Sequence, residues 1–176
     1  MPTPREETKQ KAESAAKTEK PEDAIKLLST DHREVEALFK KFEHAKEGDH
    51  SGKADIVAQI CEALTVHAEI EEEIFYPAAR DALKDMDGDL LHEAEVEHAS
   101  IKNLVEQLEE GEPDDAHYDA KVVVLMEYVR HHVKEEEGEI LPKVKKGDLD
   151  LDQLGAELFD RKTELKGDAD VEDDYN

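Results

Sequence analysis

"HAEIEEEIFYP" at residues 67–77 returns in altered form as "HVKEEEGEILP" at residues 132–142. Each stretch opens on a histidine, has a glutamate four residues later and a proline ten residues later. One such histidine–glutamate pair arises by chance in a glutamate-rich helix, whereas two copies with matching neighbours indicate an internal repeat. The repeat predicts that both stretches take the same structure and serve the same chemistry.

The repeat extends well beyond these two stretches. "DHREVEALFKKFE" (residues 31–43) matches "EHASIKNLVEQLE" (residues 97–109) in pattern. His32 precedes His67 by 35 residues in the first copy, and His98 precedes His132 by 34 residues in the second. Residues 21–84 and 88–145 are therefore interpreted as two copies of one helical hairpin.

Apolar positions in both copies recur at steps of three and four residues, which is typical of one buried face of an α-helix. Turn signals separate four long helical segments: "GDHSG" (48–52), "DMDGD" (85–89) and "GEPDD" (111–115). Short connections make neighbouring helices antiparallel. The pattern predicts an all-α, up-down-up-down four-helix bundle with an extra C-terminal helix.

Four regions follow from composition and periodicity. Residues 1–20 are polar and predict a flexible N-terminal tail. Residues 21–146 form the predicted bundle, which starts at Pro21 because proline suits the first helical turn. Residues 147–167 predict a C-terminal amphipathic helix, and residues 168–176 an acidic tail.

Charge and cysteine content exclude several classes of function. The formal net charge of −25 argues against binding to nucleic acid and to anionic membrane surfaces, and it favours a monomer. No apolar stretch is long enough to span a bilayer. The single cysteine, Cys61, excludes an internal disulfide and is expected to be a packed hydrophobe. We expect a cytoplasmic protein.

Six polar residues interrupt the apolar faces of the four helices at one level of the bundle. Burying them without partners would cost several kcal/mol or more. One or two metal ions would satisfy all six, and mixed imidazole and carboxylate donors suit iron, manganese or zinc. The predicted metal ligands are His32, His67, Glu71, His98, His132 and Glu136.

Other polar residues near this layer are expected to lie outside it. His131 is rotated by about 100° from His132 around the helix, so at most it gates access or bonds a ligand residue. Tyr76 is out of phase with the layer and is expected to pack near the bundle end, with a hydrogen bond near the metals as the less favoured alternative. The neighbouring glutamates are predicted to lie on solvated faces: Glu72, Glu73, Glu135 and Glu137. The remaining histidines are predicted at the surface: His44, His50, His92 and His117.

At these residues the sequence resembles the hemerythrin HHE cation-binding family. That family has a histidine, then HxxxE, then a histidine, then HxxxE on four successive helices, as in the six residues listed above. The resemblance implies a non-heme di-iron centre of the Fe–O–Fe type, with Glu71 and Glu136 as bridging carboxylates. Oxygen-carrying members have a further histidine on the third helix, where this chain has Ala94 or Lys102. Solvent or another carboxylate, such as Glu95, would complete the coordination.

Three functions follow as hypotheses. The first is a hemerythrin-like protein that binds dioxygen, peroxide or nitric oxide for sensing, storage or stress protection. The second is a di-iron enzyme that removes peroxide or oxidises iron. The third is a bundle stabilised by zinc, with manganese as a further possible metal, that acts as a structural or interaction module.

Overall fold

The computed structural model describes residues 22–83 and 88–172, and every element within them is helical. Four long helices make up the bundle: α2 (Ala24–Glu43), α3 (His50–Ile70), α5 (Gly88–Glu109) and α6 (Tyr118–Glu135). A π-helical turn and a short α-helix extend α3 and α6: η1 (Glu71–Phe75) with α4 (Tyr76–Leu83), and η2 (Glu136–Ile140) with α7 (Leu141–Lys146). The last helix is α8 (Leu151–Glu172).

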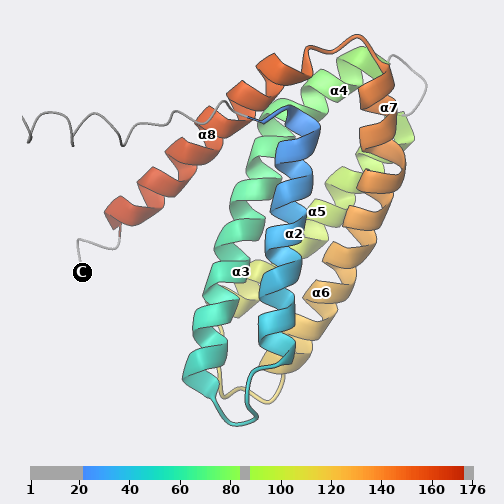
Figure 1. The fold of residues 1–176 in the computed structure, drawn as a ribbon. Coiled ribbons are helices and arrows are strands. Elements are labelled where there is room, and N and C mark those ends of the chain that lie inside the picture. The colour runs from blue at the N-terminus through green and yellow to red at the C-terminus, as the bar shows by residue number, and fades with distance from the viewer. Residues whose placement is uncertain (1–21, 84–87, 173–176) are drawn as a thin grey trace, which may run out of the picture.

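The helices run up-down-up-down, as Figure 1 shows. Helix α2 packs against α3, α5 packs against α6, and α3 also contacts α5. The predicted all-α four-helix bundle with an additional C-terminal helix is confirmed. The N-terminal tail and residues 173–176 lie outside the described residues, and helix α8 continues past residue 167 to Glu172, into the predicted acidic tail.

Helix α2 begins where an acidic cap makes the first turn favourable. The Asp23 carboxylate accepts a hydrogen bond from the Lys26 backbone N–H at 3.0 Å, which satisfies one of the free N–H groups of the helix start. Asp49 caps α3 in the same way, through the Gly52 N–H. Pro21, the predicted start of the bundle, lies outside the described residues.

The two π-helical turns explain the prolines of the repeated stretches. Pro77 and Pro142 each lie six residues after the glutamate at which their π-helical turn begins. A proline has no N–H and its ring clashes with the carbonyl four residues earlier in an α-helix. The wider turn removes this conflict: the N–H of Tyr76 bonds the carbonyl of Glu71, five residues earlier, instead of the one four residues earlier. Leu141 does the same with Glu136.

A layer of polar residues divides the hydrophobic core into two clusters. One cluster lies toward the turns that join α2 to α3 and α5 to α6, and includes Val35, Phe39, Ile60, Val122 and Leu125. The other lies where α4, α7 and α8 meet the bundle, and includes Leu28, Phe75, Leu91, Val144 and Leu158. Each cluster packs all its helices together, so either side of the polar layer is held in place by buried hydrocarbon.

Helix α8 crosses the outside of α2 and α3 (Figure 1). Leu154 and Leu158 bury their side chains in the second cluster. Gly155 makes the close approach possible, because a Cβ there would lie 2.1 Å from the Glu22 carbonyl oxygen and 2.7 Å from the Ala24 nitrogen. These neighbours are backbone atoms, which cannot rotate away.

Gly155→Ala is expected to push α8 off the start of α2. Overpacking of this kind costs about 1–3 kcal/mol, which for a chain of this size lowers Tm by about 3–10 °C. Gly167→Ala is the matched control, since it makes the same change in the same helix with nothing within 4 Å. It should leave Tm equal or slightly higher, because alanine favours the helix. Equal losses from both variants in thermal unfolding would contradict the packing role of Gly155.

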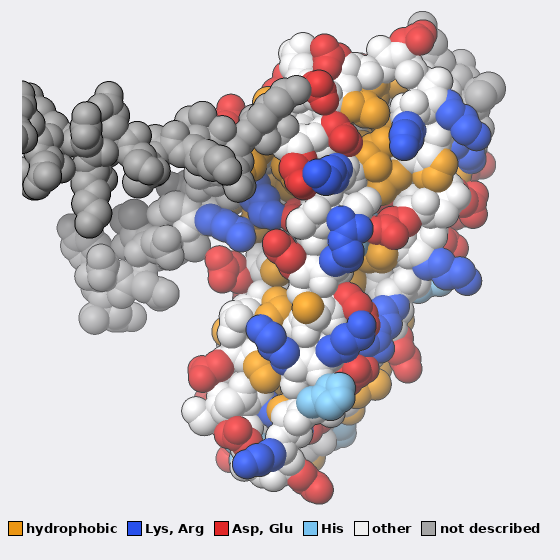
Figure 2. All heavy atoms as spheres, viewed as in Figure 1, with side chains coloured by type: hydrophobic (Ala, Val, Ile, Leu, Met, Phe, Trp, Pro, Cys, Tyr) orange, Lys and Arg blue, Asp and Glu red, His pale blue; other side chains and the backbone are white. Residues whose placement is uncertain are grey.

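The surface is strongly charged, with acidic and basic side chains interspersed over the face shown in Figure 2. An example is Arg130 of α6, which pairs across to Glu36 and Glu43 of α2 at 3.0–3.1 Å. Among the described residues, no helix combines the length and the apolar character that crossing a bilayer requires.

Candidate metal centre

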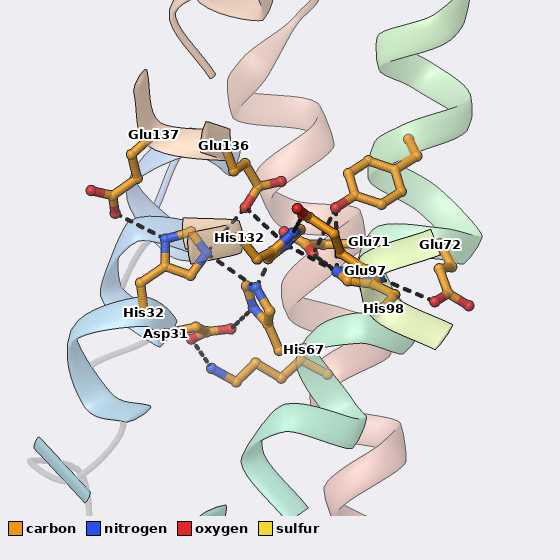
Figure 3. Close-up of polar contacts among 12 residues, drawn as sticks. Asp31, His32, His67, Glu71, Glu72, Glu97, His98, His132, Glu136 and Glu137 are labelled. Carbon is orange, nitrogen blue, oxygen red and sulfur yellow. Dashed lines mark hydrogen bonds and ion pairs between the residues drawn. The ribbon is translucent and has the colours of Figure 1, made fainter. Parts of the chain in front are cut away.

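The six predicted residues meet in the layer between the two hydrophobic clusters. All six are buried, with Glu71 and Glu136 fully inaccessible to solvent. Figure 3 shows the four imidazole rings directed toward one another, with the two carboxylates beside them. The six residues are His32 from α2, His67 from α3, Glu71 from η1, His98 from α5, His132 from α6 and Glu136 from η2. The layer therefore takes one histidine from each long helix and one glutamate from each π-helical turn.

The rings form two pairs, one in each copy of the repeat. The Nε2 atoms of His32 and His67 are 3.2 Å apart, and those of His98 and His132 are 3.1 Å apart. Glu71 reaches both pairs, with Oε1 3.2 Å from His67 Nε2 and Oε2 3.2 Å from His98 Nε2. Donor atoms therefore converge on two adjacent positions, each with two imidazoles, and Glu71 belongs to both groups.

The second carboxylate lies closer to the first pair of rings than to the second. Oε2 of Glu136 lies 3.1 Å from His32 Nε2 and 4.0 Å from His132 Nε2. Each glutamate thus lies near one ring from each copy of the repeat, which is the arrangement expected of a carboxylate shared by two cations.

The donor set fits metal ions better than it fits a closed hydrogen-bond network. Oε1 of Glu71 and both carboxylate oxygens of Glu136 are buried and accept no hydrogen bond from the described residues. A buried carboxylate without such partners is costly. The nearby Nε2 atoms approach at ion-pair distance without hydrogen-bond geometry, so cations between the nitrogens and oxygens are the natural compensation.

Four further carboxylates hold the outer nitrogen of each ring. The Nδ1 atoms lie 2.8–3.4 Å from the carboxylate oxygens. Since an ionised carboxylate only accepts, each Nδ1 carries a proton and donates it, so Nε2 is the ring nitrogen that is directed inward and would bind a cation. The pairs are Asp31 with His67, Glu137 with His32, Glu72 with His98, and Glu97 with His132.

These pairs repeat the internal symmetry of the chain. The acidic residue just before the first histidine of each copy, Asp31 or Glu97, bonds the second histidine of the same copy. The acidic residue just after each buried glutamate, Glu72 or Glu137, bonds the first histidine of the other copy. The prediction that Glu72 and Glu137 only face solvent is therefore incomplete, because both are partly exposed and yet bond an imidazole. The recurrence of an acid at equivalent places in both copies is the sequence signal that identifies all four.

Tyr76 was predicted to lie out of phase with the layer, and this is wrong. Its hydroxyl is buried 3.4 Å from Glu71 Oε2 and 3.3 Å from His98 Nε2. The π-helical turn adds one residue between Glu71 and Tyr76 relative to an α-helical repeat, and this turns the phenol inward. Leu141 has the equivalent position in the second copy, so only one side of the layer has a hydroxyl group.

The electrostatics of the layer favour charged forms. Burial alone would lower the pKa of His67, but the carboxylates of Glu71, Asp31 and Glu136 together outweigh it and the pKa rises to about 10. Burial would raise the pKa of Glu71, yet His67 and His98 bring it well below its ordinary value. Burial, together with the Glu71 and Glu136 carboxylates, raises the pKa of the Tyr76 phenol, so the phenol stays protonated and can donate.

A cavity of about 20 Å³ adjoins the four rings. Besides the histidines and Asp31, its walls are apolar: Val35, Leu64, Ala68, Ile101, Val129 and Val133. A space of this size holds one small molecule of about the size of water. The layer therefore has room for a small ligand on its apolar side.

The other candidates lie away from the centre. Glu95 is exposed and its Oε1 pairs with Arg80 at 2.6 Å, so it does not enter the layer. His131 is exposed and lies 3.3 Å from Glu97, which makes it a neighbour of a residue that holds His132. Cys61 is buried, and burial raises the pKa of its thiol to about 12, as expected for a packed hydrophobe. The four histidines predicted at the surface are exposed: His44, His50, His92 and His117.

Two known proteins resemble this chain, one in sequence and one in fold. A DNA nickase from Nostoc sp. (strain PCC 7120) is 29% identical over 119 residues, which cover 68% of this chain but 32% of the relative. The chain thus matches about a third of the length of that protein. The crystal structure of a hemerythrin HHE cation binding domain-containing protein from Mycobacterium kansasii superposes with a TM-score of 0.71 at 22% identity, covering 84% of this chain and 90% of the other.

The family model for the hemerythrin HHE cation binding domain matches residues 23–144. This range spans the four long helices, both π-helical turns and all six residues of the buried layer. The chain belongs to the hemerythrin HHE cation-binding domain family.

Proposed function

We propose that this chain holds a non-heme di-iron centre and binds dioxygen, peroxide or nitric oxide for sensing, storage or stress protection. The observation that carries the proposal is the buried layer itself: four imidazoles and two carboxylates converge on two adjacent positions, and three of the four carboxylate oxygens accept no hydrogen bond from the described residues. Two shared carboxylates with two imidazoles at each position suit a pair of iron ions, with manganese as an alternative metal.

Each residue has a definite part in the proposal. The four Nε2 atoms and the carboxylates of Glu71 and Glu136 would hold the ions, which supply redox chemistry and open coordination positions when bound. The outer carboxylates keep the rings oriented with Nε2 inward. The two hydrophobic clusters exclude bulk water, and the apolar cavity of about 20 Å³ admits only a small molecule.

One observation supports the enzymatic alternative. The Tyr76 hydroxyl is a buried proton donor on one side of the layer. Cleavage of peroxide needs protons delivered at the reacting oxygens, so peroxide removal is the second candidate. Tyr76→Phe would slow peroxide loss in an enzyme while leaving the iron content unchanged.

We do not propose DNA nicking, the activity in the name of the Nostoc relative, for this chain. The matched part is a third of that protein, and a net charge of −25 repels the phosphates of DNA. The same charge favours dispersed monomers, and the one buried cysteine suits a cytoplasmic location, which we include in the proposal.

Anaerobic reconstitution tests the proposal. Metal-free protein is loaded with Fe(II) and then exposed separately to dioxygen, peroxide and nitric oxide, while the metal content and absorption spectrum are recorded. We expect about two irons per chain and oxo-to-iron charge-transfer bands after oxidation. A chain that takes up zinc in preference to iron and stays colourless would support the zinc-stabilised bundle instead.

A further inference from the structure

The four outer carboxylates differ in their surroundings. The Asp31 side chain is 7% exposed, compared with 24% for Glu97, 34% for Glu72 and 42% for Glu137. A carboxylate as buried as Asp31 needs compensation by the protein, because water does not reach it. One hydrogen bond comes from His67, and the other partner is Lys162, whose ammonium group pairs with Asp31 Oδ1.

Lys162 comes from outside the repeat that builds the layer. It lies on α8, whereas the cation beside Glu72 is Lys102 of α5, within the second copy itself. Burial of Leu158 in the core seats this part of the helix, and Arg161 adds a more exposed pair with Glu73 of η1 at 2.7 Å. The position of the ammonium group is therefore fixed relative to the buried layer.

We propose that Lys162 is a positioning residue for the His32–His67 half of the metal centre. It holds Asp31 in the orientation in which Asp31 accepts the His67 Nδ1 proton, and this directs His67 Nε2 at the cation position. Figure 3 shows Asp31 beside His67, and the Lys162 ammonium group pairs with the other oxygen of the same carboxylate. The inference rests on the proposed function, in which the layer binds metal ions. Through Lys162, helix α8 would then orient the metal-binding residues of the His32–His67 half of the centre.

The first test is metal affinity. Lys162→Met is expected to weaken one of the two zinc- or iron-binding steps by about tenfold, the lower end of what loss of an outer partner costs. Lys162→Arg keeps the charge and should restore most of the affinity. Arg161→Met is the matched control: it removes the neighbouring cation of α8, whose exposed pairs contribute little, and should leave both steps unchanged. An equal loss in Arg161→Met would assign the effect to docking of α8 in general and overturn the proposal.

A double-mutant cycle tests the route through Asp31. If Lys162 acts through Asp31, Lys162→Met should have no further effect on affinity in the Asp31→Asn background. Additive losses would show that Lys162 acts by another route and would refute the assignment.

A readout without metal separates this inference from the proposed function. The His67 Nδ1 proton should give a downfield NMR resonance that exchanges slowly with water in the metal-free wild type and in Arg161→Met. In Lys162→Met the exchange should be faster and the resonance should move upfield. If the wild type binds no metal, the proposed function fails, yet this resonance still decides whether Lys162 positions His67.

Discussion

Simultaneous replacement of His67 and His132 with alanine is expected to abolish metal binding. The double variant removes one ring from each histidine pair, so each proposed cation position keeps a single imidazole. Loss of only an outer partner typically costs about 10–100-fold in affinity, and loss of a direct donor at both positions should cost more. Iron content measured after reconstitution should fall from about two per chain to near zero.

The matched control replaces two exposed histidines, His92→Ala with His117→Ala, and should keep full iron content. The double variant should retain its helices, because the hydrophobic clusters on either side of the layer stay intact. Circular dichroism checks this directly. A folded double variant that still binds iron at the wild-type ratio would show that the six-residue assignment is wrong.

The helix positions and the six candidate residues could be predicted from the sequence because both follow from the spacing of residues along an α-helix. Apolar residues at steps of three and four fix which face of each helix is buried. His67 and Glu71, four residues apart, must share that face, and the second copy repeats the pattern with His132 and Glu136. The repeat also gives the level of the layer, since equal hairpins bring equivalent residues to equal heights.

The other contacts of the centre depend on helix irregularities and helix packing, which the spacing of apolar residues does not predict. The π-helical turn shifts the phase after Glu71 by one residue, so extrapolating the α-helical period moved Tyr76 away from the centre. The bond between Glu72 and His98 joins η1 to α5, and its formation depends on how these helices cross. The contact between Lys162 and Asp31 depends on where α8 packs against the bundle, and the spacing of apolar residues in α8 does not predict this.

The repeated hairpin builds a nearly symmetric layer that is asymmetric in its chemistry. Tyr76 and Leu141 occupy equivalent places after the two π-helical turns, and so supply a hydroxyl on one side and a hydrocarbon on the other. Lys162 pairs with the buried Asp31 beside the first copy, whereas Lys102 pairs with the more exposed Glu72 beside the second. Two cations bound here would therefore experience different surroundings, which is a condition for directing a small ligand to one of them.

The metal affinity is expected to rise steeply with pH. In the metal-free protein His67 has a pKa of about 10, so at neutral pH its ring carries a proton on Nε2 that a cation must displace. Each displaced proton raises the apparent affinity about tenfold per pH unit below the pKa of the group. Zinc titration against a competing chelator, between about pH 6 and pH 8, should therefore show an affinity gain of about 100-fold or more.

The stability of the metal-free protein should change in the opposite direction. The pKa of His67 is raised from 6.5 to about 10, so its contribution to the free energy of unfolding is complete below the unfolded value and is lost as pH rises toward about 10. The pKa of Glu71 is lowered from 4.5, so its contribution is present above the unfolded value and is lost as pH falls below it. The layer thus stabilises the metal-free fold most between about pH 5 and pH 6.5.

Asp31→Asn tests whether protonation of His67 causes the pH dependence of the metal affinity. Asp31 is one of the groups that raise the pKa of His67, so its neutral replacement should lower that pKa and flatten the dependence of zinc affinity on pH. His131→Gln is the control, because that exposed ring lies beside Glu97 and contacts no inner nitrogen. If the wild-type affinity does not change with pH, the rings are already neutral in the metal-free protein. The buried carboxylates would then lack counterions before metal binds, and the ion-paired layer described here would not exist in solution.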